Sequence, residues 1–132
     1  CLVLSQNLKT LIKIIKKRIK NAQLYENYLT NKIIKPPFKS DFQHVYYTYS
    51  IICKSRDKLK RYLSVKKGIE TKIQHPFIIS DHPGLKDKNN FSKKFPIGNK
   101  IKKELLSLPI HEKLNKKKIF YIIKAVNNFY EK

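Results

Sequence analysis

The spacing of apolar residues changes from helical to strand-like along this chain, and the order of these segments constrains the fold more than any other feature. Residues 4–29 repeat apolar side chains at helical intervals, and Pro36-Pro37 then breaks the chain. Residues 44–53 alternate β-branched and aromatic side chains at the interval of a strand. A long helix followed by a short strand predicts a helix that lies against a small sheet.

The middle of the chain repeats this alternation on a smaller scale. Ser55 is a suitable N-cap for a short helix that carries Leu59 and Leu63 on its apolar face. Gly68 stands where a left-handed residue would end that helix. Residues 69–73 then alternate like a second strand.

Two further helices are predicted near the end of the chain, after an irregular loop at 74–95. Pro96 is a favourable first residue for one of them, and an extended piece at 107–110 follows it. Asn115 is a suitable N-cap for the closing helix, whose apolar residues recur from Ile119 onward at helical spacing. The sequence therefore predicts an α/β fold of the two-layer α+β type, in which helices cover a small antiparallel-type sheet that a long helix precedes.

The chain is strongly basic, with 30 lysine and arginine residues against 9 acidic ones and a net charge of +21. Of these 30 cations, 27 are lysine, and successive segments of 44 residues hold 8, 8 and 11 of the lysines. Nucleic-acid footprints tend to be clustered and to use arginine. Drift of the gene toward codons rich in A and T explains an even spread of lysine better than binding of nucleic acid does. A small basic nucleic-acid-binding module remains the alternative hypothesis.

No motif in the sequence identifies a catalytic site. The chain has three glycines, too few for a Gly-rich phosphate loop, and no apolar run long enough to span a membrane. Cys1 and Cys53 are too few for a four-cysteine zinc site, and Cys53 falls on the apolar face of its strand, as an inert buried thiol would. His75, Asp81 and His82 have no helical or hairpin spacing that would hold them together, so we predict no metal site.

Four segments of the chain, taken in order, carry a resemblance to a known family. They are RIKNAQLYENYL at 18–29, HVYYTYSIICKSRDKLKRYLSVKKGIETKIQHP at 44–76, FPIGNKIKKELLSLPIHEKL at 95–114 and KKKIFYIIKAVNNFY at 116–130. Together they resemble the C-terminal small domain of the DegT/DnrJ family of nucleotide-sugar aminotransferases, which depend on pyridoxal phosphate (PLP). The resemblance implies fold type I architecture, with an interdomain helix at 1–30 and the small domain at 31–132.

The same resemblance implies an activity that needs more than this chain. The family transfers an amino group, here expected from glutamate, to a keto-sugar nucleotide in cell-surface polysaccharide or amino-sugar biosynthesis. Its large domain holds PLP as a Schiff base with a lysine. The chain begins at Cys1 and contains no methionine, so we expect a piece of a longer protein without that large domain. We therefore expect this piece to bind no cofactor, to contain no catalytic residue and to be inactive alone.

The resemblance also implies where the protein acts and what it contacts. A complete enzyme of this kind is expected to be cytoplasmic and homodimeric, with no membrane partner and only non-specific contact with nucleic acid. Four residues stand at positions where the family contacts its substrate. Gln74 and His75 replace a common histidine and tyrosine in the loop after the second strand, Ser80 replaces a histidine that often follows, and Tyr47 replaces a histidine of the first strand. We expect these four residues to bind the nucleotide sugar, whose sugar the sequence does not identify.

Overall fold

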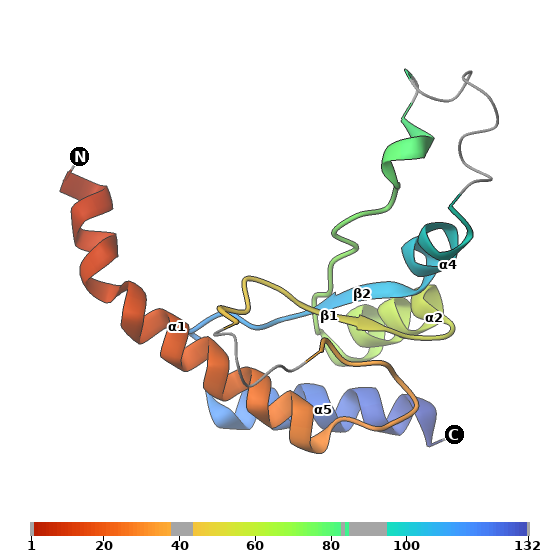
Figure 1. The fold of residues 1–132 in the computed structure, drawn as a ribbon. Helices are drawn as coiled ribbons and strands as arrows, with labels where there is room; N and C mark the ends of the chain where they lie inside the picture. Colours follow the sequence, from red (N-terminus) through yellow and green to blue (C-terminus); the bar gives the residue numbers. More distant parts are fainter. Residues whose placement is uncertain (1, 38–43, 83, 85–94, 132) are drawn as a thin grey trace.

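The structure is a computed structural model that describes residues 2–37, 44–82, 84 and 95–131, with side chains from Leu8 onward. In chain order its elements are helix α1 (Leu2–Tyr28), strand β1 (Tyr49–Ile52), helix α2 (Arg56–Arg61), a π-helical turn (Tyr62–Lys66), a 3₁₀ turn (Ile79–Asp81), helix α4 (Pro96–Glu104), strand β2 (Leu105–Leu108) and helix α5 (Lys116–Tyr130). Figure 1 shows the two strands in the middle of the molecule, with α1 and α5 to one side and α2 and α4 near the far end of the strands.

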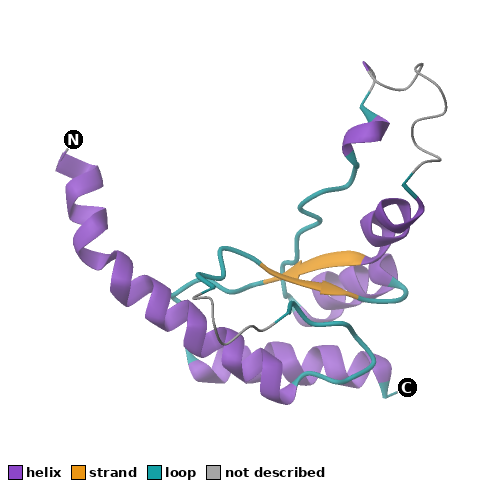
Figure 2. Ribbon diagram, in the orientation of Figure 1, coloured by secondary structure: helices purple, strands orange, loops and turns teal. Residues whose placement is uncertain are grey.

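The two strands form an antiparallel pair, in which Tyr49 lies opposite Leu108 and Ile52 opposite Leu105. Each outer edge of this pair carries one isolated bridge. Ile34 joins the β1 edge at Ile52, and Lys72 joins the β2 edge. The predicted fold class is confirmed, since helices cover a small antiparallel sheet and a long helix precedes it (Figure 2).

The core lies where the second half of α1 and the apolar face of α5 meet the sheet. Figure 1 shows α5 running alongside the C-terminal half of α1, below the strands. The two helices and the residue that follows α1 contribute the buried side chains Ala22, Tyr25, Leu29, Ile119, Ile122, Ile123, Ala125 and Val126. Burial of these apolar side chains supplies the main stabilisation of the fold.

Hydrogen bonds fix the end of α1 against α5 and against the segment that follows β2. The Asn127 side chain donates to the Tyr28 carbonyl at 2.9 Å and accepts from the Thr30 amide at 2.9 Å. It thereby satisfies backbone groups that the end of a helix leaves unpaired. The Tyr25 hydroxyl donates to the Pro109 carbonyl at 2.7 Å. These bonds join residues from opposite ends of the chain.

The first half of α1 projects beyond this core, as Figure 1 shows. Leu8 and Ile12 are 66% and 67% exposed, whereas Ala22 and Tyr25 are buried. The periodicity over residues 4–29 thus predicts the helix correctly. In the part of the chain that the structure describes, however, only the second half of its apolar stripe is packed.

The first strand is shorter than predicted and begins at Tyr49, because the preceding backbone leaves the extended conformation. Tyr46 has a left-handed φ of 47°, which ends the alternation of faces. Tyr46 is therefore buried, and Tyr47 is exposed, opposite to the sides expected from a strand over 44–53. The alternation holds beyond this point, where Tyr49, Ile51 and Cys53 are buried on one face.

The predicted turn signals are confirmed in part. Gly68 adopts a φ of 63°, the left-handed conformation that glycine favours, and the Asn115 side chain accepts from the Lys118 amide at 2.9 Å. Ser55 is the N-cap of α2, but its own φ is 58° and its side chain makes no capping hydrogen bond. The prediction of a strand at 69–73 was wrong, because only Lys72 forms a β-bridge there.

Substituting Ile123 with aspartate tests the packing of α5. Because Ile123 of α5 is buried in the core, Ile123→Asp places an unpaired carboxylate in an apolar environment. We expect the free energy of unfolding to fall by about 4 kcal/mol, measured by urea denaturation. The neighbouring Lys124→Asp is the control, because Lys124 is exposed and its change should cost about 0.5 kcal/mol or less. Equal stability of the two variants would contradict the packing described here.

Candidate functional site

A cleft of about 610 Å³ lies beside β2, and its volume falls within the range of small-molecule sites. Residues 68–72 form one wall, and residues 107–111, which include the end of β2, form another. The first turns of α5 and the Arg18 side chain of α1 complete the lining. Segments far apart in the sequence therefore build this cleft.

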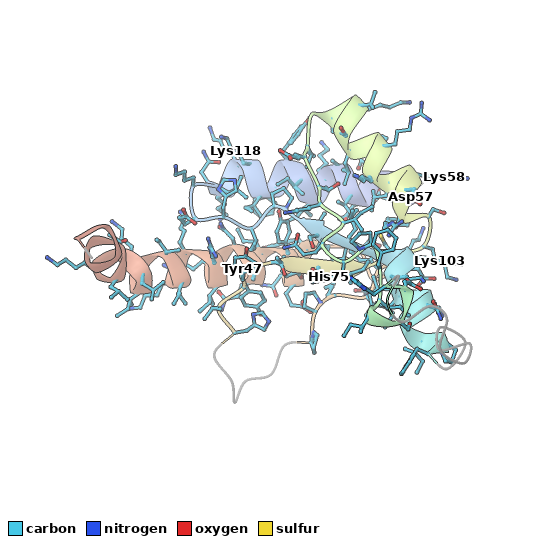
Figure 3. All side chains as sticks on the ribbon, turned by 90° about the horizontal axis from the view of Figure 1, so that it is seen from above. Tyr47, Asp57, Lys58, His75, Lys103 and Lys118 are labelled. Carbon is cyan, nitrogen blue, oxygen red and sulfur yellow. The ribbon has the colours of Figure 1, made fainter. Side chains whose placement is uncertain are left out.

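The structure brings two of the four residues expected to bind substrate to this cleft. Tyr47 and Gln74 line it, with Tyr47 75% exposed and Gln74 half-buried. His75 is exposed and is not part of the lining. Figure 3 shows Tyr47 and His75 over the middle of the molecule, with Lys118 near the start of α5.

Ser80 lies elsewhere, in the segment at residues 75–82 that we call the arm. Figure 1 shows the arm rising from the sheet on the side of α4. The Asp81 carboxylate accepts from Lys102 Nζ of α4 at 2.7 Å and from the Ile78 amide at 3.2 Å. Ser80 is buried in this arm and does not line the cleft. The four predicted residues thus divide between two places.

Three buried oxygens in this region have no hydrogen-bond partner among the described residues. They are Thr71 Oγ1, Gln74 Oε1 and Ser80 Oγ. A buried polar group without a partner costs about 1–3 kcal/mol, so native structures keep few of them. Thr71 and Gln74 both line the cleft. Two of the three unsatisfied oxygens therefore belong to residues of the cleft, and the third, on Ser80, lies in the arm.

Positive side chains dominate the cleft. Arg18, Lys72 and Lys118 line it, and Glu70 is the single carboxylate among its described lining residues. Arg18 is held in place by Glu112, with Nη2 and Oε2 3.2 Å apart. A backbone hydrogen bond, together with the Arg18 guanidinium, holds the pKa of Glu112 below its ordinary value. The balance of charge favours an anionic ligand.

Buried tyrosines support the wall of the cleft at Pro109. Burial raises the pKa of Tyr25 above its ordinary value, so its hydroxyl stays protonated and donates to the Pro109 carbonyl. Burial also raises the pKa of Tyr49, whose hydroxyl lies 3.4 Å from a Glu26 carboxylate oxygen. The two tyrosine rings pack with their centroids 4.8 Å apart. These contacts hold the backbone of this wall at Pro109.

Comparison with known proteins identifies the family of this chain. The model of the DegT/DnrJ/EryC1/StrS aminotransferase family matches residues 1–127. The chain therefore belongs to this family, as the resemblance in its sequence implies.

Two curated relatives are similar to the chain over 109 residues. A dTDP-3-amino-3,6-dideoxy-alpha-D-galactopyranose transaminase of Aneurinibacillus thermoaerophilus is 28% identical, and the match covers 82% of this chain and 29% of the relative. A pleiotropic regulatory protein of Geobacillus stearothermophilus is 26% identical, and the match covers 83% of this chain and 29% of the relative. The chain thus spans less than a third of the length of these relatives.

Solved structures share its fold. DesV of S. venezuelae, in complex with a ketimine intermediate, superposes with a TM-score of 0.91 at 24% identity, over 98% of this chain and 35% of that chain. A family member from Brucella abortus gives a TM-score of 0.86 at 24% identity, with the same coverage. The PLP form of the sugar aminotransferase Spr1654 from Streptococcus pneumoniae gives 0.82 at 17% identity, over 94% of this chain and 33% of that chain.

The residues that line the cleft do not fit a PLP site. That cofactor needs a lysine for its Schiff base and a partner for its ring nitrogen. The lysines of the cleft, Lys72 and Lys118, are exposed, and so is Glu70, the one carboxylate in its described lining.

Neither a metal centre nor a membrane-spanning helix is present within the described residues. No group of three or more His, Cys, Asp or Glu side chains among them could hold a metal ion, so His75, Asp81 and His82 are not brought together as ligands. No helix within the described ranges is long and apolar enough to cross a membrane.

Sequence reasoning missed most of the residues that line the cleft. Lys72 and Lys118 carry no local signal, because lysines occur throughout the chain. Arg18 comes from α1, distant in sequence from the rest. Thr71 could have been found from the sequence. It is a polar residue on the same face as Ile69 and Ile73 in an alternating pattern. A polar residue at an apolar position indicates either a buried hydrogen bond or a site.

The Cys53 thiol should be unreactive in the folded chain. It is buried directly after β1, and burial raises the pKa of the thiol above its ordinary value. Little thiolate therefore forms at mildly alkaline pH, and reagents have no access to it. We expect a Cys1→Ser variant to gain no mass from iodoacetamide in buffer and one adduct in concentrated urea. Rapid alkylation in buffer would show that this face of β1 opens to solvent.

Proposed function

We propose that this chain is the C-terminal small domain of a PLP-dependent sugar aminotransferase, with residues 1–30 as its interdomain helix and residues 31–132 as the domain itself. The whole enzyme would transfer an amino group from glutamate to a keto-sugar nucleotide for cell-surface polysaccharide or amino-sugar biosynthesis. It would be a cytoplasmic homodimer. The chain alone would bind no PLP and would be inactive.

The match of the family model to residues 1–127 carries this proposal. The fold supports it, because 98% of this chain superposes on 35% of the DesV chain. DesV itself holds a ketimine intermediate, and one of the curated relatives is a sugar transaminase. The remaining two-thirds of such a chain would supply the PLP site.

The role proposed for this domain is to hold substrate rather than to perform chemistry. Tyr47 and Gln74 would contact the nucleotide sugar from the cleft. His75 and Ser80 would contact it from the arm, which Asp81 and Lys102 hold against α4. Two contact regions on one domain suit an extended substrate, because each end can be recognised separately.

The first test is the DNA upstream of the Cys1 codon. We expect an open frame that continues for the length of a large domain and encodes a lysine in a Schiff-base context. A stop codon directly upstream, with no such frame, would contradict the proposal of a working enzyme.

An activity assay of the isolated chain tests the proposed division of labour. With PLP, glutamate and a keto-sugar nucleotide present, the 132-residue chain should produce no amino sugar above the rate without protein. A full-length family member assayed in parallel controls for the reagents. Turnover by the isolated chain would show that these residues contain a complete active site.

A second function, binding of nucleic acid, is favoured by one feature of α1. Five lysines recur between positions 9 and 20 of this helix, and none forms an ion pair with a described residue; they are Lys9, Lys13, Lys16, Lys17 and Lys20. A functional binder would hold single or double strands with affinity that falls steeply as salt rises. Weak retention on both at physiological salt would support the enzyme proposal instead.

A further inference from the structure

The segment that leads into β1 contains a strained residue whose conformation depends on one ionisable side chain. We propose that His44 is a pH-sensitive positioning residue. As a neutral imidazole it holds the left-handed backbone of Tyr46 and thereby fixes Tyr47 at the cleft, and protonation of its ring releases this segment. We call the contact between His44 and Tyr46 the latch. The latch is a property of the chain itself, and only its consequence for substrate rests on the proposed function.

The backbone of Tyr46 is strained. Tyr46 and Ser55 are the two non-glycine residues of the described chain with a positive φ. The φ of Tyr46, 47°, lies in the left-handed region, which is unfavourable for an L-residue because Cβ approaches the following carbonyl oxygen. Such a conformation persists only where the surrounding structure holds it. Tyr46 is 5% exposed, so its side chain is also committed to the core. Specific contacts must therefore offset the strain.

The His44 ring supplies two of these contacts. Its Nδ1 atom accepts a hydrogen bond from the Tyr46 amide at 2.9 Å, and its ring packs on the Tyr46 ring with the centroids 4.3 Å apart. On its other side, Tyr46 lies 6.1 Å from the ring of Tyr49, which packs on Tyr25 of α1. A row of four aromatic rings thus runs from the exposed His44 into the core.

The hydrogen bond from the Tyr46 amide requires the neutral form of His44. An Nδ1 atom that accepts a hydrogen bond carries no proton, so the proton of the neutral ring lies on Nε2. In the protonated ring both nitrogens are donors, and two N–H groups would then face each other in the latch. Histidine is the side chain that ordinarily changes its charge between about pH 5 and 8. Because His44 is exposed, water reaches the ring and solvates its cation. Acid therefore opens the latch.

The other described ionisable groups along this row leave His44 as the group that titrates near neutral pH. Burial, with a smaller contribution from the Glu26 carboxylate, raises the pKa of Tyr46, and burial also raises the pKa of Tyr49. Both hydroxyls therefore stay protonated through neutral pH. Glu26 accepts from the Tyr49 hydroxyl at 3.4 Å and lies 3.9 Å from Lys35 Nζ. No described carboxylate forms an ion pair with His44 that would hold its cation in place.

Opening of the latch changes the lining of the cleft. Tyr47 and Thr48 belong to this lining, and the backbone of Tyr46 sets their position. When Tyr46 relaxes to an extended φ, the alternation of β1 continues back through residue 46, and Tyr47 then lies on the same face as Tyr49. Tyr47 thus moves relative to the rest of the cleft. The contact proposed between Tyr47 and the nucleotide sugar is then lost in acid, and this consequence rests on the proposed function.

Two variants of His44 separate the latch from general effects of acid. Asparagine carries an acceptor oxygen that bonds to the amide two residues on, and it does not titrate, whereas alanine carries no acceptor. His44→Asn should therefore keep the latch closed at every pH, and His44→Ala should leave it open at every pH. The control is His82→Asn, which removes another exposed histidine and should respond to pH like the parent chain.

NMR of the 132-residue chain at about pH 8 and about pH 5 measures the latch directly. In the parent chain we expect the His44 proton on Nε2 and a nuclear Overhauser contact between the Tyr46 and Tyr49 rings at the higher pH. This contact should disappear in acid as the His44 ring titrates. It should persist at both pH values in His44→Asn and be absent at both in His44→Ala. A contact that survives acid in the parent chain, or that survives in His44→Ala, would overturn the proposal.

Melting temperatures give a second readout. The unfolded chain takes up the proton on His44 without losing a hydrogen bond, so the folded parent chain loses stability as the pH falls. Acid should therefore lower the melting temperature of the parent chain by about 3 °C or more beyond its effect on His44→Asn. Equal drops in both chains would show that His44 holds nothing in place. Neither measurement uses a substrate, so failure of this inference and failure of the proposed function can be told apart.

Discussion

The structure depends on the burial of one face of α1 against α5, because this contact joins the two ends of the chain and closes the core. Tyr25 is central to it. Its ring packs on Tyr49 of β1, and its hydroxyl donates to Pro109 after β2. Asn21 adds bonds from its amide to the carbonyls of His111 and Leu114, at 3.4 and 3.5 Å. The contact that closes the core therefore also fixes the segment at 107–111 that forms one wall of the cleft.

Features that the sequence specifies locally could be predicted. The helix that begins at Pro96, the cap at Asn115 and the left-handed Gly68 all follow from residue types whose backbone preferences act over a few positions. The periodicity of α5 was also sufficient to predict the helix and its buried face, since the apolar residues at helical spacing are the ones that face the core. For the candidate site, the family resemblance pointed to Tyr47 and Gln74, which the structure places in one cleft.

Features that arise from tertiary contacts could not be predicted. Nothing in a run of aromatic residues indicates that Tyr46 adopts a positive φ, where its amide donates to the Nδ1 atom of the His44 ring at 2.9 Å. Edge pairing at residues 69–73 is limited to Lys72, although the residue alternation is that of a strand. Lys118 and Arg18 reach the cleft only because α5 and α1 pack together. Tertiary packing, rather than sequence spacing, brings these side chains to the cleft.

Both parts of the structure that project from the core carry exposed apolar side chains. Leu8 and Ile12 lie on the first half of α1, and Phe77 and Ile79 lie on the arm, where they are 74% and 83% exposed. Figure 1 shows these two projections rising from the same side of the sheet. Two apolar projections of this kind are costly in water unless another surface covers them. The proposed function supplies such a surface, because a large domain seated between α1 and the arm would cover both, and would bring its chemistry next to the arm that carries His75 and Ser80.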